Sequence, residues 1–149
     1  MGETVDGTLS RRAALGMGAA GAVVAAAQAA QAQPAAGSAG PLKIVFHVSD
    51  PDGWAPALSN VRNMKAQYPD ALLRVVVDGG GVYMLAGRSD VTPEFARFAA
   101  AGVEFQACHN ALHEKKIDPA AVPPGVKVVP AGVVALAQSQ RDGYAYIKP

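Results

Sequence analysis

Cys108, the only cysteine of this 149-residue chain, is the residue whose type and position point most directly to chemistry. It follows segment 103–107, whose apolar residues alternate as in a strand, and it precedes helical spacing at Ala111 and Leu112. Backbone N–H groups and the positive dipole end at a helix start stabilise a thiolate. A single cysteine makes no disulfide within its chain, so Cys108 is a free thiol or pairs between chains. An inert core cysteine is an equally good interpretation of its position.

The three histidines are the next candidates for chemistry. His109 is adjacent to Cys108 and His113 lies one helical turn further on, so either imidazole could exchange a proton with the sulfur. With His47 and Cys108 they could form a soft site for copper or zinc. The sequence shows no ligand pattern of fixed spacing, so exposed histidines without a ligand role are favoured and no metal is predicted.

Asp78 and the three glycines that follow it, at 79–81, could in principle cradle an anion. The segment lacks the lysine and the Ser/Thr of a phosphate loop, so a tight turn at a strand end is favoured and no cofactor is predicted. The net charge of +1 and the lack of a basic stripe exclude nucleic acid as a predicted partner.

The elements that must position these residues alternate between strand and helix. Strands are predicted at 42–48, 72–77, 103–107, 126–129 and 144–147. Helices are predicted at 54–68, 92–101, 111–115 and 132–140, with a short one at 82–86. This order predicts an α/β fold with a mostly parallel sheet that is covered on both faces. Ligands gather beyond the carboxyl ends of such strands, where loops 49–53, 78–81 and 108–113 should meet. Trp54, Phe95, Phe98 and Phe105 are expected in the core, and Tyr144 and Tyr146 at a subunit interface on an edge strand.

The first 32 residues differ from the rest in composition. Arg11 and Arg12 precede an Ala/Gly/Val stretch that ends in the small-x-small sequence of residues 30–32. This pattern predicts a signal peptide of the twin-arginine type over 1–32, a flexible linker over 33–41 and a domain over 42–149. An uncleaved membrane anchor is the less favoured alternative, because the stretch is short and alanine and glycine bury little area. The protein is therefore expected in the periplasm, without stable membrane insertion after cleavage.

Several segments together resemble the DsrE/DsrF-like sulfur-relay family. The similar segments are 102–112 around Cys108, then 129–133, then 140–149, and the positions Phe46, His47, Val48, Trp54, Leu58 and Asn60. The resemblance covers essentially the whole predicted domain. It implies a three-layer α/β/α sandwich around a mostly parallel five-stranded sheet, the DsrE/YchN-like fold. It also implies a homotrimer or a hexamer built from trimers.

The resemblance further implies a role for Cys108. In sulfur-transferring relatives the matching cysteine takes sulfur as a persulfide and passes it to a partner thiol, so a sulfur donor and a sulfur acceptor would be partners. The leading hypothesis is a sulfur carrier in which His109 tunes the Cys108 thiol, and whether it acts as a sulfurtransferase-type enzyme is left open. Two alternatives remain: an oligomeric protein that binds a small ligand or a partner without chemistry, and a Cys/His metal-binding protein.

Overall fold

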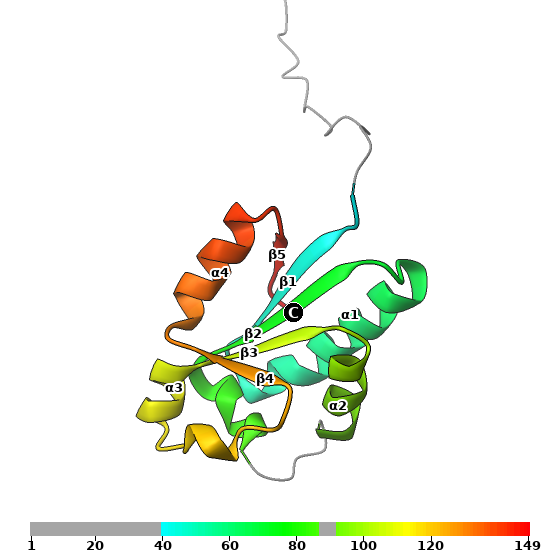
Figure 1. Cartoon of the computed structure of the whole chain (residues 1–149). Helices are drawn as coiled ribbons and strands as arrows, with labels where there is room; N and C mark the ends of the chain where they lie inside the picture. Colours follow the sequence, from blue (N-terminus) through cyan, green and yellow to red (C-terminus); the bar gives the residue numbers. More distant parts are fainter. Residues whose placement is uncertain (1–39, 87–91) are drawn as a thin grey trace, which may run out of the picture. The chain divides into compact units, whose positions relative to one another are not determined.

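A computed structural model describes residues 40–86 and 92–149 of the protein. The predicted signal peptide, 1–32, and positions 33–39 of the predicted linker lie outside the described residues. The centre of the described part is a five-stranded sheet in the order β4-β3-β2-β1-β5 (Figure 1). In residues 40–86 and 92–149, no helix is long and apolar enough to cross a membrane.

The strands lie where the apolar runs predicted them. They are β1 (Lys43–Val48), β2 (Leu72–Val77), β3 (Glu104–Cys108), β4 (Val126–Val129) and β5 (Ala145–Ile147). Each neighbouring pair is parallel, so the sheet is parallel throughout. The three central strands are rich in buried apolar residues, as expected where helices cover both faces of a sheet. The terminal strand β5 is at an edge, as predicted, and β4 forms the other edge.

The helices also follow the predicted order. They are α1 (Trp54–Gln67), α2 (Thr92–Ala100), α3 (His109–Glu114) and α4 (Gly132–Arg141). Three 3-10 segments join them: η1 (Pro51–Gly53), η2 (Gly79–Leu85) and η3 (Pro119–Ala121). The short helix expected at 82–86 is η2, which begins three residues earlier and takes up the glycine turn.

Helices cover the two faces of the sheet unequally. Figure 1 shows α4 on one side and α1 and α2 on the other. The larger core lies on the α1 and α2 side, and it contains the four aromatic residues predicted there, Trp54, Phe95, Phe98 and Phe105. Phe105 stacks on Trp54 and meets Phe95 edge-on, with ring centroids 6.4 Å and 4.3 Å away. The smaller core under α4 consists of Val45, Val76, Val129, Ala135 and Leu136.

The sheet face under α4 also holds a polar cluster. Nε of Arg74 donates to Oε2 of Glu104 at 2.8 Å, and Nη1 donates to the hydroxyl of Ser139 on α4, also at 2.8 Å. The guanidinium lies over the ring of Tyr144, 4.5 Å from its centroid. Gln106 donates to Glu104, while its own buried Oε1 has no hydrogen-bond partner among the described residues. This face is therefore part core and part polar network, unlike the purely apolar face opposite.

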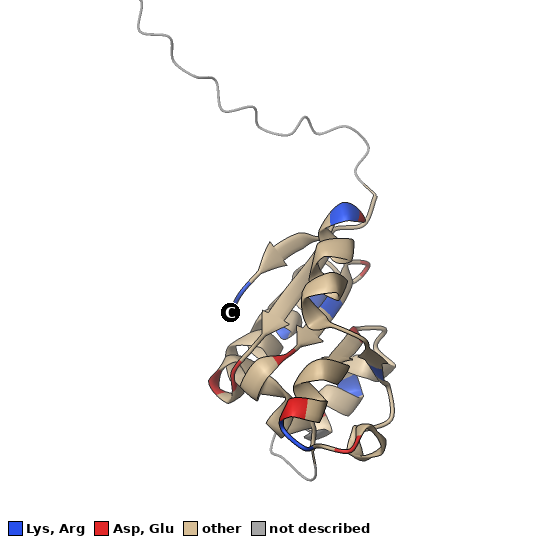
Figure 2. Ribbon diagram, turned by 90° about the vertical axis from the view of Figure 1, so that its left-hand side faces the viewer, with Lys and Arg blue, Asp and Glu red and all other residues tan. Residues whose placement is uncertain are grey.

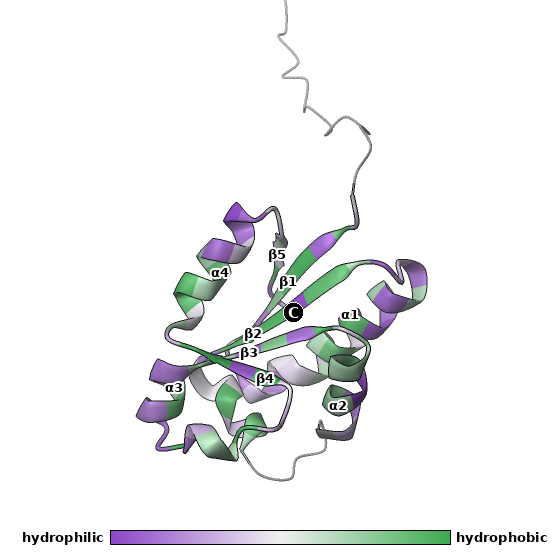
Figure 3. Cartoon of the chain, in the orientation of Figure 1, coloured by the Kyte–Doolittle hydropathy of each residue, from purple (hydrophilic) through white to green (hydrophobic). Residues whose placement is uncertain are grey.

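Charged side chains are distributed over the described surface without a single sign prevailing. Figure 2 shows Lys and Arg interspersed with Asp and Glu. Apolar colouring in Figure 3 follows the strands and also covers the first turns of α4. There, Val133 and Val134 are 70% and 52% exposed, so the start of α4 presents apolar surface outward.

Candidate functional site

The carboxyl ends of β1, β2 and β3 lie side by side at one end of the sheet. Backbone hydrogen bonds join the loops that follow β1 and β2 there. The N–H of Asp78 donates to the carbonyl of Val48 at 3.0 Å, and the N–H of Gly81 donates to that of Ser49, also at 3.0 Å. Cys108 ends β3, with Ala107 beside Val77 in the register. The structure therefore brings the carboxyl ends of these three strands together, as the parallel arrangement predicts.

The glycines after Asp78 form a tight turn. Gly79 has a φ of +47°, and a Cβ there would lie 2.7 Å from the carbonyl oxygen of Ser49. A Cβ on Gly81 would lie 2.7 Å from the carbonyl oxygen of Val48. The N–H of Gly81 is used in hydrogen bonds to Ser49 and Asp78. The favoured prediction of a strand-end turn is confirmed, and this turn holds Asp78 in place.

Cys108 is both the last residue of β3 and the N-cap of α3. Its Sγ accepts a hydrogen bond from the N–H of Ala111 at 3.4 Å. This contact places a backbone N–H donor against the sulfur at the N-cap position of α3. The residue is 6% exposed, so little of it is open to solvent in the single chain.

Two of the three histidines of the predicted Cys/His group are turned to solvent. His109 and His113 lie on α3 and are exposed. His109 lines a hollow of about 330 Å³ together with Asn110 and residues 128–130. Within residues 40–86 and 92–149, no group of three His, Cys, Asp or Glu side chains is placed to hold a metal ion. The structure thus gives no support to the alternative of a Cys/His metal site.

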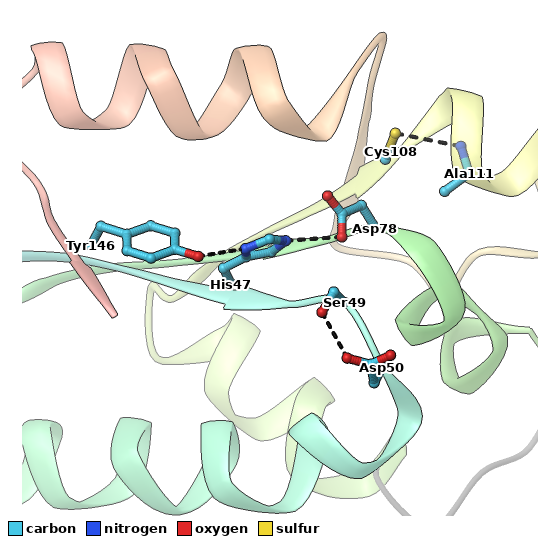
Figure 4. Close-up of polar contacts among 7 residues, drawn as sticks. All are labelled: His47, Ser49, Asp50, Asp78, Cys108, Ala111 and Tyr146. Carbon is cyan, nitrogen blue, oxygen red and sulfur yellow. Dashed lines mark hydrogen bonds and ion pairs between the residues drawn. The ribbon is translucent and has the colours of Figure 1, made fainter. Parts of the chain in front are cut away.

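The third histidine, His47, belongs to a different group of side chains (Figure 4). Its Nε2 lies 2.9 Å from Oδ1 of Asp78, and its Nδ1 lies 2.7 Å from the hydroxyl oxygen of Tyr146 on β5. The side chains of His47 and Asp78 are 15% and 24% exposed, so the pair is partly shielded from water. Two strands, β1 and β5, and the residue that follows β2 therefore contribute to one line of hydrogen bonds on the sheet face below α4.

Gly132, the first residue of α4, lies close to both Asp78 and Cys108. A Cβ on Gly132 would lie 3.0 Å from Cβ and 3.1 Å from Oδ2 of Asp78, and 3.3 Å from Cβ of Cys108. Both side chains therefore pack against the same backbone position. Figure 4 shows Asp78 between His47 and Cys108. The site accordingly combines a thiol, a carboxylate, an imidazole and a phenol.

Sequence reasoning missed the roles of Asp78 and Tyr146, which it placed in a turn and at a subunit interface. The register supplies the signal that could have found them. In the strand pairing, His47 lies beside Val76, which is two residues before Asp78. Tyr146 lies beside Val45, which is two residues before His47. Because side chains two residues apart share a face of a sheet, these three side chains had to lie on one face once the strand order was known.

The polar cluster further along this face sets the charge of Glu104. Burial raises the pKa of Glu104, but the hydrogen bonds from Gln106 and Arg74 and the charges of Arg74 and Lys127 outweigh that effect. The pKa of Glu104 is therefore below its ordinary value, and Glu104 is a carboxylate at neutral pH. Its position, four residues before Cys108, places a fixed ion pair beneath α4.

Comparison with known proteins adds a family and a fold. Residues 57–149 match the model of the DsrE/DsrF-like family. The protein of unknown function MTH1491 from Methanobacterium thermoautotrophicum is 33% identical, with a TM-score of 0.68 over 72% of this chain and 99% of its own. The ychN protein from E. coli is 17% identical, with a TM-score of 0.62 over 72% and 99%. The protein BT1422 from Bacteroides thetaiotaomicron, also of unknown function, is 14% identical, with a TM-score of 0.59 over 72% and 94%. No curated protein matches the chain.

These similarities confirm the predicted architecture. The last two structures show the fold alone, and that fold is the expected α/β sandwich around a five-stranded parallel sheet. The matched family residues include Asp78, Cys108, Gly132 and Tyr146, while His47 precedes them.

Proposed function

The chain belongs to the DsrE/DsrF-like family, and from this premise we propose that it is a sulfur carrier that holds a sulfane sulfur on Cys108 as a persulfide. The observation that carries the proposal is the position of the Cys108 sulfur at the start of α3, with the Ala111 N–H directed at it. The chain has no second cysteine, so a sulfur received by Cys108 would leave to a thiol of another molecule.

The chemistry of the site supports this role. A persulfide on Cys108 would keep Sγ at the Ala111 N–H, and its outer sulfur would carry the negative charge. The surroundings of the thiol, Leu112 on α3 and Ala107 on β3, are apolar and buried. Such surroundings would protect a sulfane sulfur from water. In this proposal His109, which is exposed and follows the cysteine in the chain, assists proton exchange between the Cys108 sulfur and solvent.

The setting of the protein is part of the same proposal. The predicted leader places it in the periplasm, where a sulfur donor and a sulfur acceptor would be its partners. We further propose that the chain assembles as a homotrimer or as a hexamer built from two trimers. The exposed valines at the start of α4 and the exposed edge strand β5 support an assembly, because both present apolar side chains to solvent in the single chain.

A second candidate function, a binding protein without chemistry, is favoured by one observation. Cys108 is 6% exposed, and a thiol this well covered is often only a small apolar core residue. In that case the hollow beside His109 and the apolar surface of α4 would serve a ligand or partner, and the cysteine would only fill space.

Intact mass spectrometry of the purified protein after exposure to inorganic polysulfide tests the two candidates. A carrier should gain the mass of one or more sulfur atoms, and lose it again on treatment with a reductant. Cys108→Ala should gain none. A folded wild-type protein that gains no sulfur would overturn the carrier and leave the binding protein as the better account.

A further inference from the structure

The strand β4 forms a free edge of the sheet, because no strand among residues 40–86 and 92–149 pairs with its outer side (Figure 1). Such an edge presents unpaired backbone groups to any extended segment that comes beside it. The N–H of Val126 is used in a turn, where it donates to the carbonyl of Pro123 at 3.2 Å. Because neighbouring residues of a strand direct their N–H groups to opposite sides, the N–H and the carbonyl of Val128 then face outward. Pro130, which follows the strand, has no N–H and limits the pairing to these few residues.

Two hollows adjoin this edge. The hollow beside α3, of about 330 Å³, contains His109 and Asn110, and the hollow beside α4, of about 290 Å³, contains Val134 and Ala135. Residues 128–130 line both hollows. The edge strand therefore has a hollow next to each of the helices that flank its carboxyl end.

The two hollows lie on opposite faces of the sheet. Val128 packs against the larger core, to which Leu112 of α3 also belongs, whereas Val129 belongs to the core under α4. The side chains of a strand added beside β4 would alternate between the same two faces. Successive residues would thus enter first one hollow and then the other, which is how edge-strand binding of a peptide obtains its specificity.

The hollow beside α4 joins apolar surface to a positive charge. Val129 is 9% exposed and Val134 is 52% exposed, so both can contact an apolar side chain. Lys127 lies two residues before Val129, on the same face of the sheet, and it lines the same hollow. It is exposed, and its ammonium group has no hydrogen bond or ion pair within the described part of the chain. The carboxylate on which its charge acts, Glu104, is already bonded to Arg74.

We propose that the β4 edge is a docking site for an extended segment of another protein, which adds to the sheet as a further strand. Two side chains of that segment, two residues apart, would be an apolar one over Val129 and a carboxylate at Lys127. This inference does not depend on whether Cys108 carries sulfur.

The lysine selects against a second copy of the chain as the occupant. Antiparallel pairing of β4 with its own copy about a twofold axis would place two Lys127 side chains opposite or diagonal to each other on one face. Like charges so placed are destabilising, and a lysine on an edge strand opposes such self-pairing. An acidic segment meets a complementary charge at the same position.

The test measures binding of a fluorescein-labelled peptide, Thr-Glu-Thr-Val-Thr-Glu-Thr-amide, to the full-length protein by fluorescence anisotropy. Its threonines and valine favour an extended chain. A glutamate lies two residues from the valine on both sides, so the peptide satisfies the pattern in either strand direction. We expect saturable binding that is at least about tenfold tighter than that of a peptide with lysine at both glutamate positions.

A charge-reversal variant shows whether Lys127 meets the peptide. Lys127→Glu should reverse the preference, so that the lysine peptide binds about tenfold more tightly than the glutamate peptide. A misfolded variant would lose affinity for both peptides and would not reverse the preference. Lys148→Glu, at an exposed position after the opposite edge strand, is the matched control and should keep the wild-type preference.

Amide hydrogen exchange followed by NMR tests for backbone pairing. The glutamate peptide should slow exchange at the Val128 amide by at least about tenfold, because its outward N–H gains an acceptor. Binding without slower exchange at Val128 would overturn the addition of a strand.

Three other outcomes would also overturn the proposal. One is no saturable binding of the glutamate peptide to wild-type protein. Another is equal affinity for the two peptides, which would leave Lys127 only the role of keeping the edge unpaired. The third is a Val128 amide that is already protected in the protein alone, with no peptide bound, which would show a second copy on the edge. Polysulfide treatment tests Cys108 separately, so failure of this inference is distinguished from failure of the sulfur carrier.

Discussion

Gly132 lies so close to Cys108 that a Cβ on the glycine would be 3.3 Å from Cβ of the cysteine. The same added atom would lie 3.0 Å from Cβ of Asp78. The first residue of α4 therefore closes the site from above, and it does so only because it lacks a side chain. This contact ties the stability of α4 to the geometry of the thiol and the carboxylate.

Replacing Gly132 by valine should lower the free energy of unfolding by about 1–3 kcal/mol, because the added methyl groups must displace Asp78 or Cys108. Ala137→Val, at an exposed position of the same helix, is the control and should change stability by less than about 0.5 kcal/mol. Urea unfolding followed by circular dichroism measures both. Equal midpoints for the two variants would contradict the close packing at Gly132.

Trp54→Phe should lower the free energy of unfolding by about 1–3 kcal/mol, because it leaves the carbonyl of Gly81 without its buried donor. In the wild type, Nε1 of Trp54 donates to that carbonyl at 2.9 Å, and the ring is 1% exposed. Tyr68→Phe alters an aromatic residue that is 49% exposed and should have almost no effect. Thermal unfolding compares the two, and similar losses in both would show that the Gly81 contact contributes nothing.

The pH dependence of the free energy of unfolding should show the contribution of the Glu104 carboxylate. Its pKa is lowered in the folded protein below the ordinary value of 4.5, so the unfolded chain binds more protons at mildly acidic pH. The stabilisation by Glu104 is therefore present above pH 4.5, and it is lost as the pH falls through the folded pKa. Glu104→Gln should be less stable than wild type at pH 7, and this difference should shrink below pH 4.5.

The size of this effect is limited by solvent. The side chain of Glu104 is 38% exposed, so we expect a difference of less than about 1 kcal/mol at pH 7. Asp70→Asn removes an exposed carboxylate and serves as the control. Urea titrations at several pH values measure both variants. A difference between Glu104→Gln and wild type that stays constant with pH would contradict the lowered pKa.

Val133→Asp should weaken the proposed homotrimer or hexamer, since a charge would then replace an apolar side chain that is 70% exposed in the single chain. An aspartate in the first turn of α4 favours the helix dipole, so the fold should be kept. Gln140→Asp, at an exposed position near the other end of α4, is the control. Light scattering after size exclusion should show smaller species for Val133→Asp at concentrations where the control stays assembled. If both variants assemble like wild type, the start of α4 lies outside the interface.

The sequence predicted the fold closely for a physical reason. Short apolar runs that alternate with helical spacing leave few arrangements other than a parallel sheet between helices. The run 72–77 became β2 with the same bounds, and Trp54 begins α1 as expected. The turn after Asp78 was also predictable, because three glycines in a row permit backbone contacts that other residues exclude.

The candidate site was predictable only in part. Cys108 was found because it is the only cysteine and because strand-end and helix-start signals converge on it. His109 was chosen for its proximity along the chain, and the structure places it exposed on α3, while the imidazole in the line of side chains beside Cys108 belongs to His47. Adjacency in sequence therefore indicated a different histidine from the one that bonds to Asp78.

By itself, then, the sequence determined the α/β sandwich, the parallel sheet, the glycine turn and the position of the thiol at a strand end. These features follow from the spacing of apolar, glycine and proline residues that are close together in the sequence. The order of strands and their register decided that Asp78, His47 and Tyr146 share one face and that Gly132 joins them to Cys108. Those residues are brought together by pairing between distant segments and by the packing of α4 on the sheet, and such contacts have no signature in local spacing.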